Sequence, residues 1–295
     1  MFRHLNFLAA NISQALAGAI ELGLGFLLPF YLLLVIGVSP AAAGIALIPG
    51  TVPIIVFGPL AGRAFDRIGG RIPLTIGFGV LALSGVALAI GAAGRDAISL
   101  IPGLALQGIG LGIVLTTNDP TGLTAVPEKD RGEAAGMINT TEQFGGAIGI
   151  AALTALEIGY FRDTMYDKLG AQGIDPTPEQ AEKFKQFVLQ AEQTGLEHAE
   201  KSRLIRSGLE DLISSHVASF QLTFYVAAAI AVLGGVICFL LVRRGDRVAE
   251  GPIFSRRSRW AYVTTGHGPG ITRQPRDAVA HHSPREATEP RRPDT

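Results

Sequence analysis

The sequence predicts an all-α membrane protein with six transmembrane helices. Composition is the first reason: 48% of the 295 residues are hydrophobic and only 17% are charged, whereas a soluble chain carries about 25% charged residues. The second reason is that charge is segregated, since Glu21 is the one acidic residue between positions 7 and 62. The third is a set of long apolar segments. A chain with this pattern has lipid as its main solvent.

Six apolar segments are each long enough to cross a bilayer, which takes about 20 residues. Pro29 interrupts the first, overlong segment and predicts a tilt or kink near its far end. Short links join the first five segments and predict antiparallel neighbours in a bundle. In chain order the segments are Phe7–Ile36, Ala41–Ala61, Ile72–Ala92, Ile98–Thr117, Ala134–Leu156 and Val217–Val242.

Basic residues predict the orientation of these segments. Arg and Lys gather before the first segment, in the links 62–71 and 127–133, and after Val242. These positions share one side if six spans are counted. Because cytoplasmic loops carry the excess of Lys and Arg, we expect a multi-pass protein of the plasma membrane with both termini in the cytoplasm.

The rest of the chain is polar. Residues 1–157 hold the first five spans and 217–242 the sixth, which leaves 158–216 as an extracytoplasmic loop. A capping box at 177–180 with proline in the first turn, followed by apolar residues at helical spacing over 184–191 and 204–213, predicts two amphipathic helices there. Residues 243–295 lack apolar periodicity and predict a disordered basic cytoplasmic tail, whose arginines could touch anionic lipid headgroups.

Motifs for most other functions are missing. Cys238 is the single cysteine, which excludes an intramolecular disulfide and a Cys-based zinc site. The sequence has no Gly-rich phosphate loop, no Gly-x-Ser-x-Gly and no His-Glu-x-x-His. We therefore expect no enzymatic activity, no catalytic residue, no cofactor and no metal site. A nucleic-acid partner is not expected either, because membrane tethering already explains the basic tail.

The link between the second and third segments carries the most specific motif. It runs Gly62-Arg63-Ala64-Phe65-Asp66-Arg67-Ile68-Gly69-Gly70-Arg71, with the form Gly-x-x-x-Asp-Arg-x-Gly-x-Arg. Gly62 would allow close helix packing, and Asp66 would satisfy exposed amides at a helix start. Arg67 and Arg71 would hold the link in the cytoplasm and pair with carboxylates or helix carbonyls. The alternative is a plain turn that follows the positive-inside rule.

This motif resembles the signature loop of the major facilitator superfamily. The stretches 27–32, 37–50 and 136–149 resemble the second half of a fourteen-helix drug–proton antiporter of that family, and the resemblance covers residues 2–245. It implies a half bundle of the major-facilitator type that exports drugs or other amphipathic small molecules, driven by protons. It also implies that the arginine-rich loop acts as a latch between conformations.

The resemblance further implies a missing partner. Transporters of this superfamily rock two six-helix bundles around a midplane site. We therefore expect that the sequence is part of a longer transporter, or that it pairs with another half or with a second copy of itself. Two alternatives stay open: a truncated fragment that does not transport, and a membrane sensor or assembly partner.

Polar residues inside the apolar segments are candidates for transport and coupling, because their burial in lipid is costly. A stripe on the first segment, at spacings of 3 and 4, combines small and polar residues and predicts a face turned to the interior or a cavity. Glu21, near mid-span, is the first candidate for a protonatable or cation-sensing group; the alternative is a hydrogen-bonded helix contact. The stripe consists of Asn11, Gln14, Gly18, Glu21 and Gly25.

The fourth and fifth segments supply three more candidates. Asn139 and Glu142 lie on a similar stripe of the fifth segment, and the position of Glu142 near the cytoplasmic end predicts a gating or interface pair. Gln107 in the fourth segment is a candidate for lining the cavity. Asn118 and Asp119 precede Pro120 and are expected to close that helix, with Asp119 capping or pairing locally.

Overall fold

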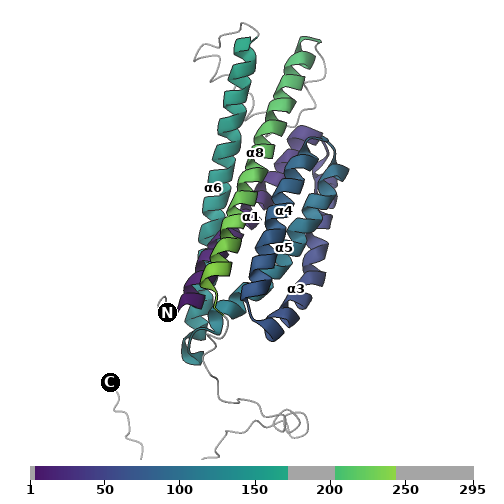
Figure 1. Ribbon diagram of the computed structural model, residues 1–295. Coiled ribbons are helices and arrows are strands. Elements are labelled where there is room, and N and C mark those ends of the chain that lie inside the picture. Colours follow the sequence, from purple (N-terminus) through teal and green to yellow (C-terminus); the bar gives the residue numbers. More distant parts are fainter. Residues whose placement is uncertain (1–3, 172–202, 244–295) are drawn as a thin grey trace, which may run out of the picture. The chain divides into compact units, whose positions relative to one another are not determined.

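The computed structural model describes residues 4–171 and 203–243, with side chains described over 4–168 and 213–243. All of them fall in one compact unit, Met1–Val248. The described residues are helical apart from short links, and six helical stretches are long and apolar enough to cross a membrane (Figure 1). The predicted all-helical fold with six spans is therefore confirmed.

Helix boundaries follow the local sequence. Ser39 caps α2 by accepting a hydrogen bond from the Ala42 amide at 3.3 Å, and Asp96 caps α5 by accepting one from the Ser99 amide at 2.8 Å. The elements are α1 (Leu5–Tyr31), the π-helix η1 (Leu32–Ile36), α2 (Pro40–Ala46), α3 (Ile48–Ile68), α4 (Arg71–Ala92), α5 (Ala97–Leu123), the 3-10 helix η2 (Glu128–Asp130), α6 (Arg131–Ala171) and α8 (Arg203–Leu241).

The first span changes helix type rather than simply bending at Pro29. α1 continues through Pro29, and the chain then widens into the π-helix Leu32–Ile36. Proline has no amide hydrogen and crowds the preceding turn, and a π-turn is one way a helix accommodates such a disruption. Gly37 ends this stretch with a left-handed φ of 74°, which glycine adopts without steric cost.

Four helices run further than the apolar segments predict. α3 continues past Ala61 to Ile68. α5 continues past Thr117 to Leu123, so Asn118 lies inside the helix rather than closing it. α6 runs past Leu156 to Ala171, and α8 begins at Arg203. The stretch 204–213 is therefore continuous with the last span, because its Leu, Arg and Glu residues favour helix beyond the apolar region. The helix predicted at 177–191 and the tail after 243 lie outside the described residues.

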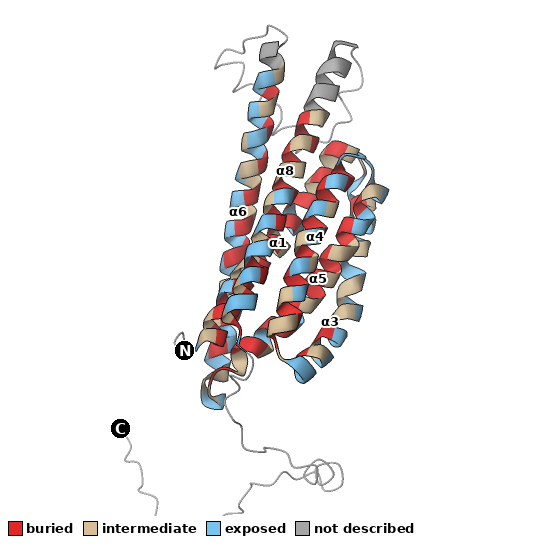
Figure 2. Ribbon diagram, viewed as in Figure 1, coloured by how far each residue is buried: buried red, intermediate tan, exposed pale blue. Residues whose placement is uncertain are grey.

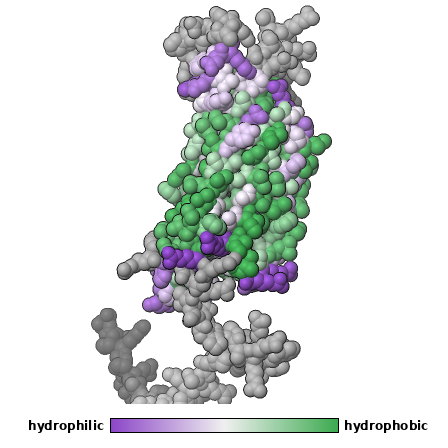
Figure 3. Space-filling model, in the orientation of Figure 1, coloured by the Kyte–Doolittle hydropathy of each residue, from purple (hydrophilic) through white to green (hydrophobic). Residues whose placement is uncertain are grey.

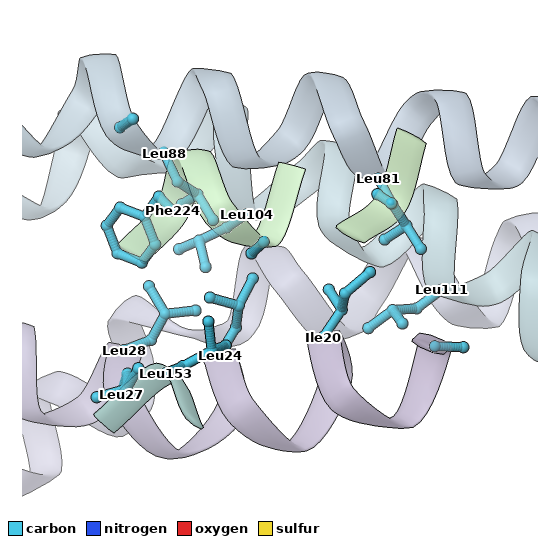
Figure 4. Close-up of a cluster of buried hydrophobic side chains, with 14 of the residues drawn as sticks. Ile20, Leu24, Leu27, Leu28, Leu81, Leu88, Leu104, Leu111, Leu153 and Phe224 are labelled. Carbon is cyan, nitrogen blue, oxygen red and sulfur yellow. The ribbon is translucent and has the colours of Figure 1, made fainter. Parts of the chain in front are cut away.

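The helices do not pack in the order of the chain. α4 packs against both α5 and α8, α1 packs chiefly against α6, and α3 packs against α5. Short links are expected to join helices that pack side by side. Among the described helices, only α4 and α5 are both joined by a short link and extensively packed against each other. The main core cluster consists mostly of leucines, alanines and aromatic rings, contributed chiefly by α1, α4, α5 and α8, with Leu153 from α6 (Figure 4).

The helices differ in how far they are buried. The most apolar stretches of α1, α4 and α5 are 50% buried, those of α6 and α8 are 33% and 39% buried, and that of the span formed by α2 and α3 is 11% buried (Figure 2). The visible surface carries an apolar belt between hydrophilic ends (Figure 3). An apolar surface of this kind suits lipid or a second bundle.

The two ends of the bundle differ in charge. One end, here called the arginine end, holds the start of α1, the links α3–α4 and α5–α6, and the end of α8. Asn6 ties it together: its side-chain amide donates to the Arg243 carbonyl at 3.2 Å, and its oxygen accepts from the Arg243 amide at 2.8 Å. The opposite end holds the link α4–α5, the end of α6 and the start of α8, and there α6 and α8 project beyond the other helices (Figure 1).

Candidate functional site

Glycines bring α1 and α6 into backbone contact. A methyl group built on Gly145 would collide with the Ala15 carbonyl, and one on Gly149 would collide with the Ala19 carbonyl. Gly18 faces the Glu142 carbonyl in the same way. Small residues allow such close approach between helices in a membrane. The polar stripes predicted on the first and fifth segments therefore do meet at one interface.

A polar network fills this interface together with α5. The Asn118 oxygen accepts a hydrogen bond from the Ser13 hydroxyl at 2.5 Å, and the Asn118 amide donates to the Ala10 carbonyl at 2.9 Å and to the Gln14 oxygen. The Gln14 amide in turn donates to the Glu142 carboxylate at 2.6 Å. This polar network comprises Asn11, Ser13, Gln14, Asn118, Thr141 and Glu142.

A backbone carbonyl fixes the direction of the chain of amides. Ala10 can offer only an oxygen, so the Asn118 NH2 group must point toward it. The same NH2 group then meets the Gln14 oxygen, which leaves the Gln14 NH2 group to face Glu142. Glu142 is therefore presented with a donor, the arrangement that suits a carboxylate. The network orients a carboxyl group rather than merely burying polar atoms.

Thr141 fastens a second point of the same interface. Its hydroxyl donates to the Asn11 oxygen at 3.0 Å, while the Asn11 amide donates to the Phe7 carbonyl of its own helix at 2.9 Å. Asn11 and Gln14 are both buried, with 4% and 2% of their surface exposed, and Glu142 is half-buried. Glu142 is thus the member of the network that reaches toward the exposed face of α6.

Two more carboxyl groups lie within the electrostatic range of Glu142. Glu21 is two turns beyond Gln14 on α1 and is half-buried, and Asp119 is exposed beside Asn118 on α5. One carboxylate oxygen of Glu21, Oε2, is buried without a hydrogen-bond partner among the described residues. An ionised carboxyl group is costly to bury in a membrane span, and a bound proton or cation offsets that cost. The arrangement can therefore hold and release protons or attract a cation.

The structure does not bring every predicted residue into this network. Gln107 is buried on α5, about 16 Å along the helix from Asn118 by the usual rise per residue. Asn139 is exposed on α6, one turn before Glu142. Three members of the network, Ser13, Asn118 and Thr141, were not predicted. The sequence feature that could have identified these three residues is that each is polar within or next to an apolar segment.

The arginine-rich link differs from its predicted arrangement. Asp66 is exposed in the last turn of α3, and α4 begins after Gly70 without a side-chain cap, so Asp66 does not serve the start of a helix. A methyl group on Gly62 would find ordinary contact with Thr116, whereas one on Gly70 would collide with Thr121. The close approach predicted for Gly62 thus occurs at Gly70.

The remaining residues of the link set its path. Gly69 has φ 77° and ψ 179°, a region that glycine alone adopts readily. Arg67 is exposed in the last turn of α3. Arg71 is half-buried with its guanidinium 4.5 Å from the centre of the Phe239 ring on α8, a cation–π contact. The link is therefore joined to α8 through Arg71.

Comparison with known proteins gives consistent results. The family model described as Major Facilitator Superfamily matches residues 1–150. The tetracenomycin C resistance and export protein of Streptomyces glaucescens is 27% identical over 257 residues, covering 85% of this chain and 47% of that protein. The multidrug resistance protein Stp of Mycobacterium tuberculosis is 29% identical over 140 residues, covering 48% of this chain and 26% of that protein.

A solved structure shares the fold. A bacterial homologue of the human lysosomal transporter Spinster, in an inward-facing and occupied conformation, has a TM-score of 0.65 at 13% identity, with 84% of this chain and 51% of that chain covered. The matched part of this chain thus corresponds to about half of that chain. The matched regions likewise amount to less than half the length of the two exporters above, at 47% and 26%.

Proposed function

Since this chain belongs to the major facilitator superfamily, we propose that it forms the C-terminal half of a proton-coupled exporter of drugs or other amphipathic small molecules. The observation that carries the proposal is the oriented carboxyl group of Glu142 at the meeting point of α1, α5 and α6. Carboxyl groups inside membrane spans are costly to bury, and they mark ion or substrate pathways.

The exporters among the relatives support the direction and the substrate class. One relative is named for resistance to and export of tetracenomycin C and another for multidrug resistance. A third, the riboflavin transporter RibZ of Clostridioides difficile, is 29% identical over 151 residues, so transporters of a vitamin also resemble this chain. Between these activities we propose export of amphipathic compounds, by a protein with both termini in the cytoplasm.

Glu142 and Glu21 share the coupling role in this proposal. When Glu142 is ionised, it accepts from Gln14 and repels Glu21; when it takes a proton, that repulsion ends and the α1–α6 contact can adjust. A proton therefore changes the relative free energy of two conformations, which is the requirement for coupled transport. Glu21 Oε2, which has no hydrogen-bond partner among the described residues, is the second proton acceptor in this proposal.

A second six-helix bundle is part of the proposal. The exposed sides of α3 and α6 carry large apolar residues, among them Ile55 at 72% and Phe144 at 65% exposure. Asn139 and Gln143 lie exposed near Glu142 on α6. A bundle placed over the exposed side of α6 would enclose Glu142 and complete a cavity between two halves.

The proposal is tested by substrate-driven proton movement in liposomes that contain a pH-sensitive dye and the native product, meaning the polypeptide that the source cell makes from this gene, together with any partner half. We expect an amphipathic drug to drive proton flux with the wild type and little flux with Glu142→Gln. Glu128→Gln, an exposed carboxylate of η2, is the matched control and should transport normally. No drug-dependent proton movement with the wild type, given its partner half, would refute proton-coupled transport.

A further inference from the structure

A second buried polar contact joins α6 to α8 near the opposite end of the bundle. Glu157 on α6 and His216 on α8 are only 6% and 8% exposed. His216 Nδ1 lies 3.2 Å from Glu157 Oε1, and the Ser219 hydroxyl donates to the same oxygen at 2.9 Å. Polar groups with ionisable side chains are rarely buried to this degree unless they are paired.

Aromatic rings enclose the histidine. Phe161, one turn from Glu157, stacks on the His216 ring with centroids 3.8 Å apart and planes 12° apart. The Phe220 ring centroid lies 6.4 Å from that of His216, and Phe220 meets Tyr31 of α1 edge-on with centroids 5.2 Å apart. The Tyr31 hydroxyl donates to the Ala92 carbonyl at the end of α4 at 2.7 Å. The pair is therefore in contact with packing that extends to α1 and α4.

We propose that Glu157 and His216 form a pH-sensitive clasp that fastens α6 to α8 where these helices leave the bundle. Histidine is the side chain that gains its charge between pH 8 and 5. A protonated imidazole gives the buried carboxylate a counter-charge and a charge-assisted hydrogen bond. A neutral imidazole gives only a neutral donor, so the carboxylate stays buried without full compensation. The clasp is tight in acid and loose at alkaline pH.

Among the residues whose side chains the structure describes, the other ionisable groups near the pair are exposed or bonded to other partners. On α6, Lys168 donates to Ser214. Arg162 and Asp163 pair with each other at 3.1 Å, and both side chains are 65% exposed. Tyr31 of α1 uses its hydroxyl on Ala92. Arg95 and Asp96 lie exposed in the α4–α5 link, and α4 has no ionisable residue between 72 and 92. Among the described residues, Glu157 is thus the acid that contacts His216.

The position of the pair gives the clasp a consequence. α6 and α8 are 41 and 39 residues long and project together beyond the other helices (Figure 1). The pair lies near the ends of α1 and α4, because Phe220 beside His216 contacts Tyr31, and Tyr31 bonds to Ala92 at the end of α4. Weakening the pair therefore loosens α6 and α8 beyond this point while the leucine core stays intact. The pH of the compartment at that end then controls how firmly the projecting end of α6 is held to the start of α8. This inference does not depend on transport activity.

Hydrogen–deuterium exchange of the full chain in lipid nanodiscs tests the clasp. Protection factors at pH 5 and pH 8 are compared after correction for the intrinsic exchange rate at each pH. In the wild type we expect amides 154–161 and 213–219 to be several-fold better protected at pH 5. His216→Asn and Glu157→Gln should abolish this difference, whereas His4→Asn, which removes an exposed histidine at the start of α1, should keep it.

A double variant covers the case in which a single variant does not fold. Replacing both members together, Glu157→Leu with His216→Phe, exchanges the pair for apolar side chains, a change that buried pairs often tolerate. We expect this variant to fold and to show equal protection at both pH values. Equal protection of the wild type at pH 5 and pH 8, or a pH difference that persists in the double variant, would overturn the clasp.

Discussion

Asn118 shows how much one residue can organise in an apolar bundle. It is fully buried and contacts Ser13, Ala10 and Gln14, so it sets which end of the Gln14 amide faces Glu142. Its role depends on α5 continuing through Pro120 to Leu123. Proline usually marks a helix boundary in a sequence. Here α5 continues through Pro120 while packed against other helices.

Replacing Asn118 by leucine should destabilise the bundle. The variant leaves the Ser13 hydroxyl and the Gln14 oxygen without their interhelical partner, and hydrogen bonds between membrane helices contribute about 0.6 to 1.7 kcal/mol each. We therefore expect a loss of about 1–2 kcal/mol in the free energy of unfolding, measured by denaturant titration in detergent. Thr124→Val is the control, since the Thr124 hydroxyl bonds only to carbonyls of its own helix. Equal stability of Asn118→Leu and the wild type would contradict the network.

At the scale of the element, α1 and α6 depend on glycine for their contact. Gly149→Ala would push a methyl group into the backbone of α1 at Ala19, so the two helices must separate along the stretch that carries Gln14 and Glu142. We expect lower thermal stability and lower transport together. Gly79→Ala on α4 is the matched control, because no atom lies within 4 Å of the added methyl group, and alanine is the better helix former. A Gly149→Ala variant that is as stable and active as Gly79→Ala would count against the close contact.

The same elements show what the sequence could predict. Apolar length located all six spans, and the polar stripes on the first and fifth segments did locate the residues that meet, Asn11, Gln14 and Glu142. The pairing of α1 with α6, rather than with a sequence neighbour, could not be predicted, because apolar periodicity does not say which helix a face will meet. The helix ends were missed for a related reason: polar residues end an apolar run without ending a helix. The Glu157–His216 pair lay in such an extension.

At the scale of the whole molecule, the exposed face of α6 is proposed to meet a second bundle. A photoreactive amino acid, such as benzoylphenylalanine, in place of Phe144 should then cross-link to another polypeptide segment in native membranes. The same residue in place of Leu83, which is 61% exposed on α4, should cross-link mainly to lipid. Mass spectrometry of the products distinguishes the partner. Lipid adducts alone at position 144 would contradict a partner over that face.

Under the proposed function, Glu142 is held by Gln14 and Asn118, and we expect substrate binding to displace its proton. The most direct measurement is the number of protons released into weakly buffered detergent solution when an amphipathic cation binds to the purified native product. We predict release on binding to the wild type and to Glu128→Gln, and binding with strongly reduced release for Glu142→Gln. Undiminished proton release from Glu142→Gln would contradict the assignment of coupling to this site.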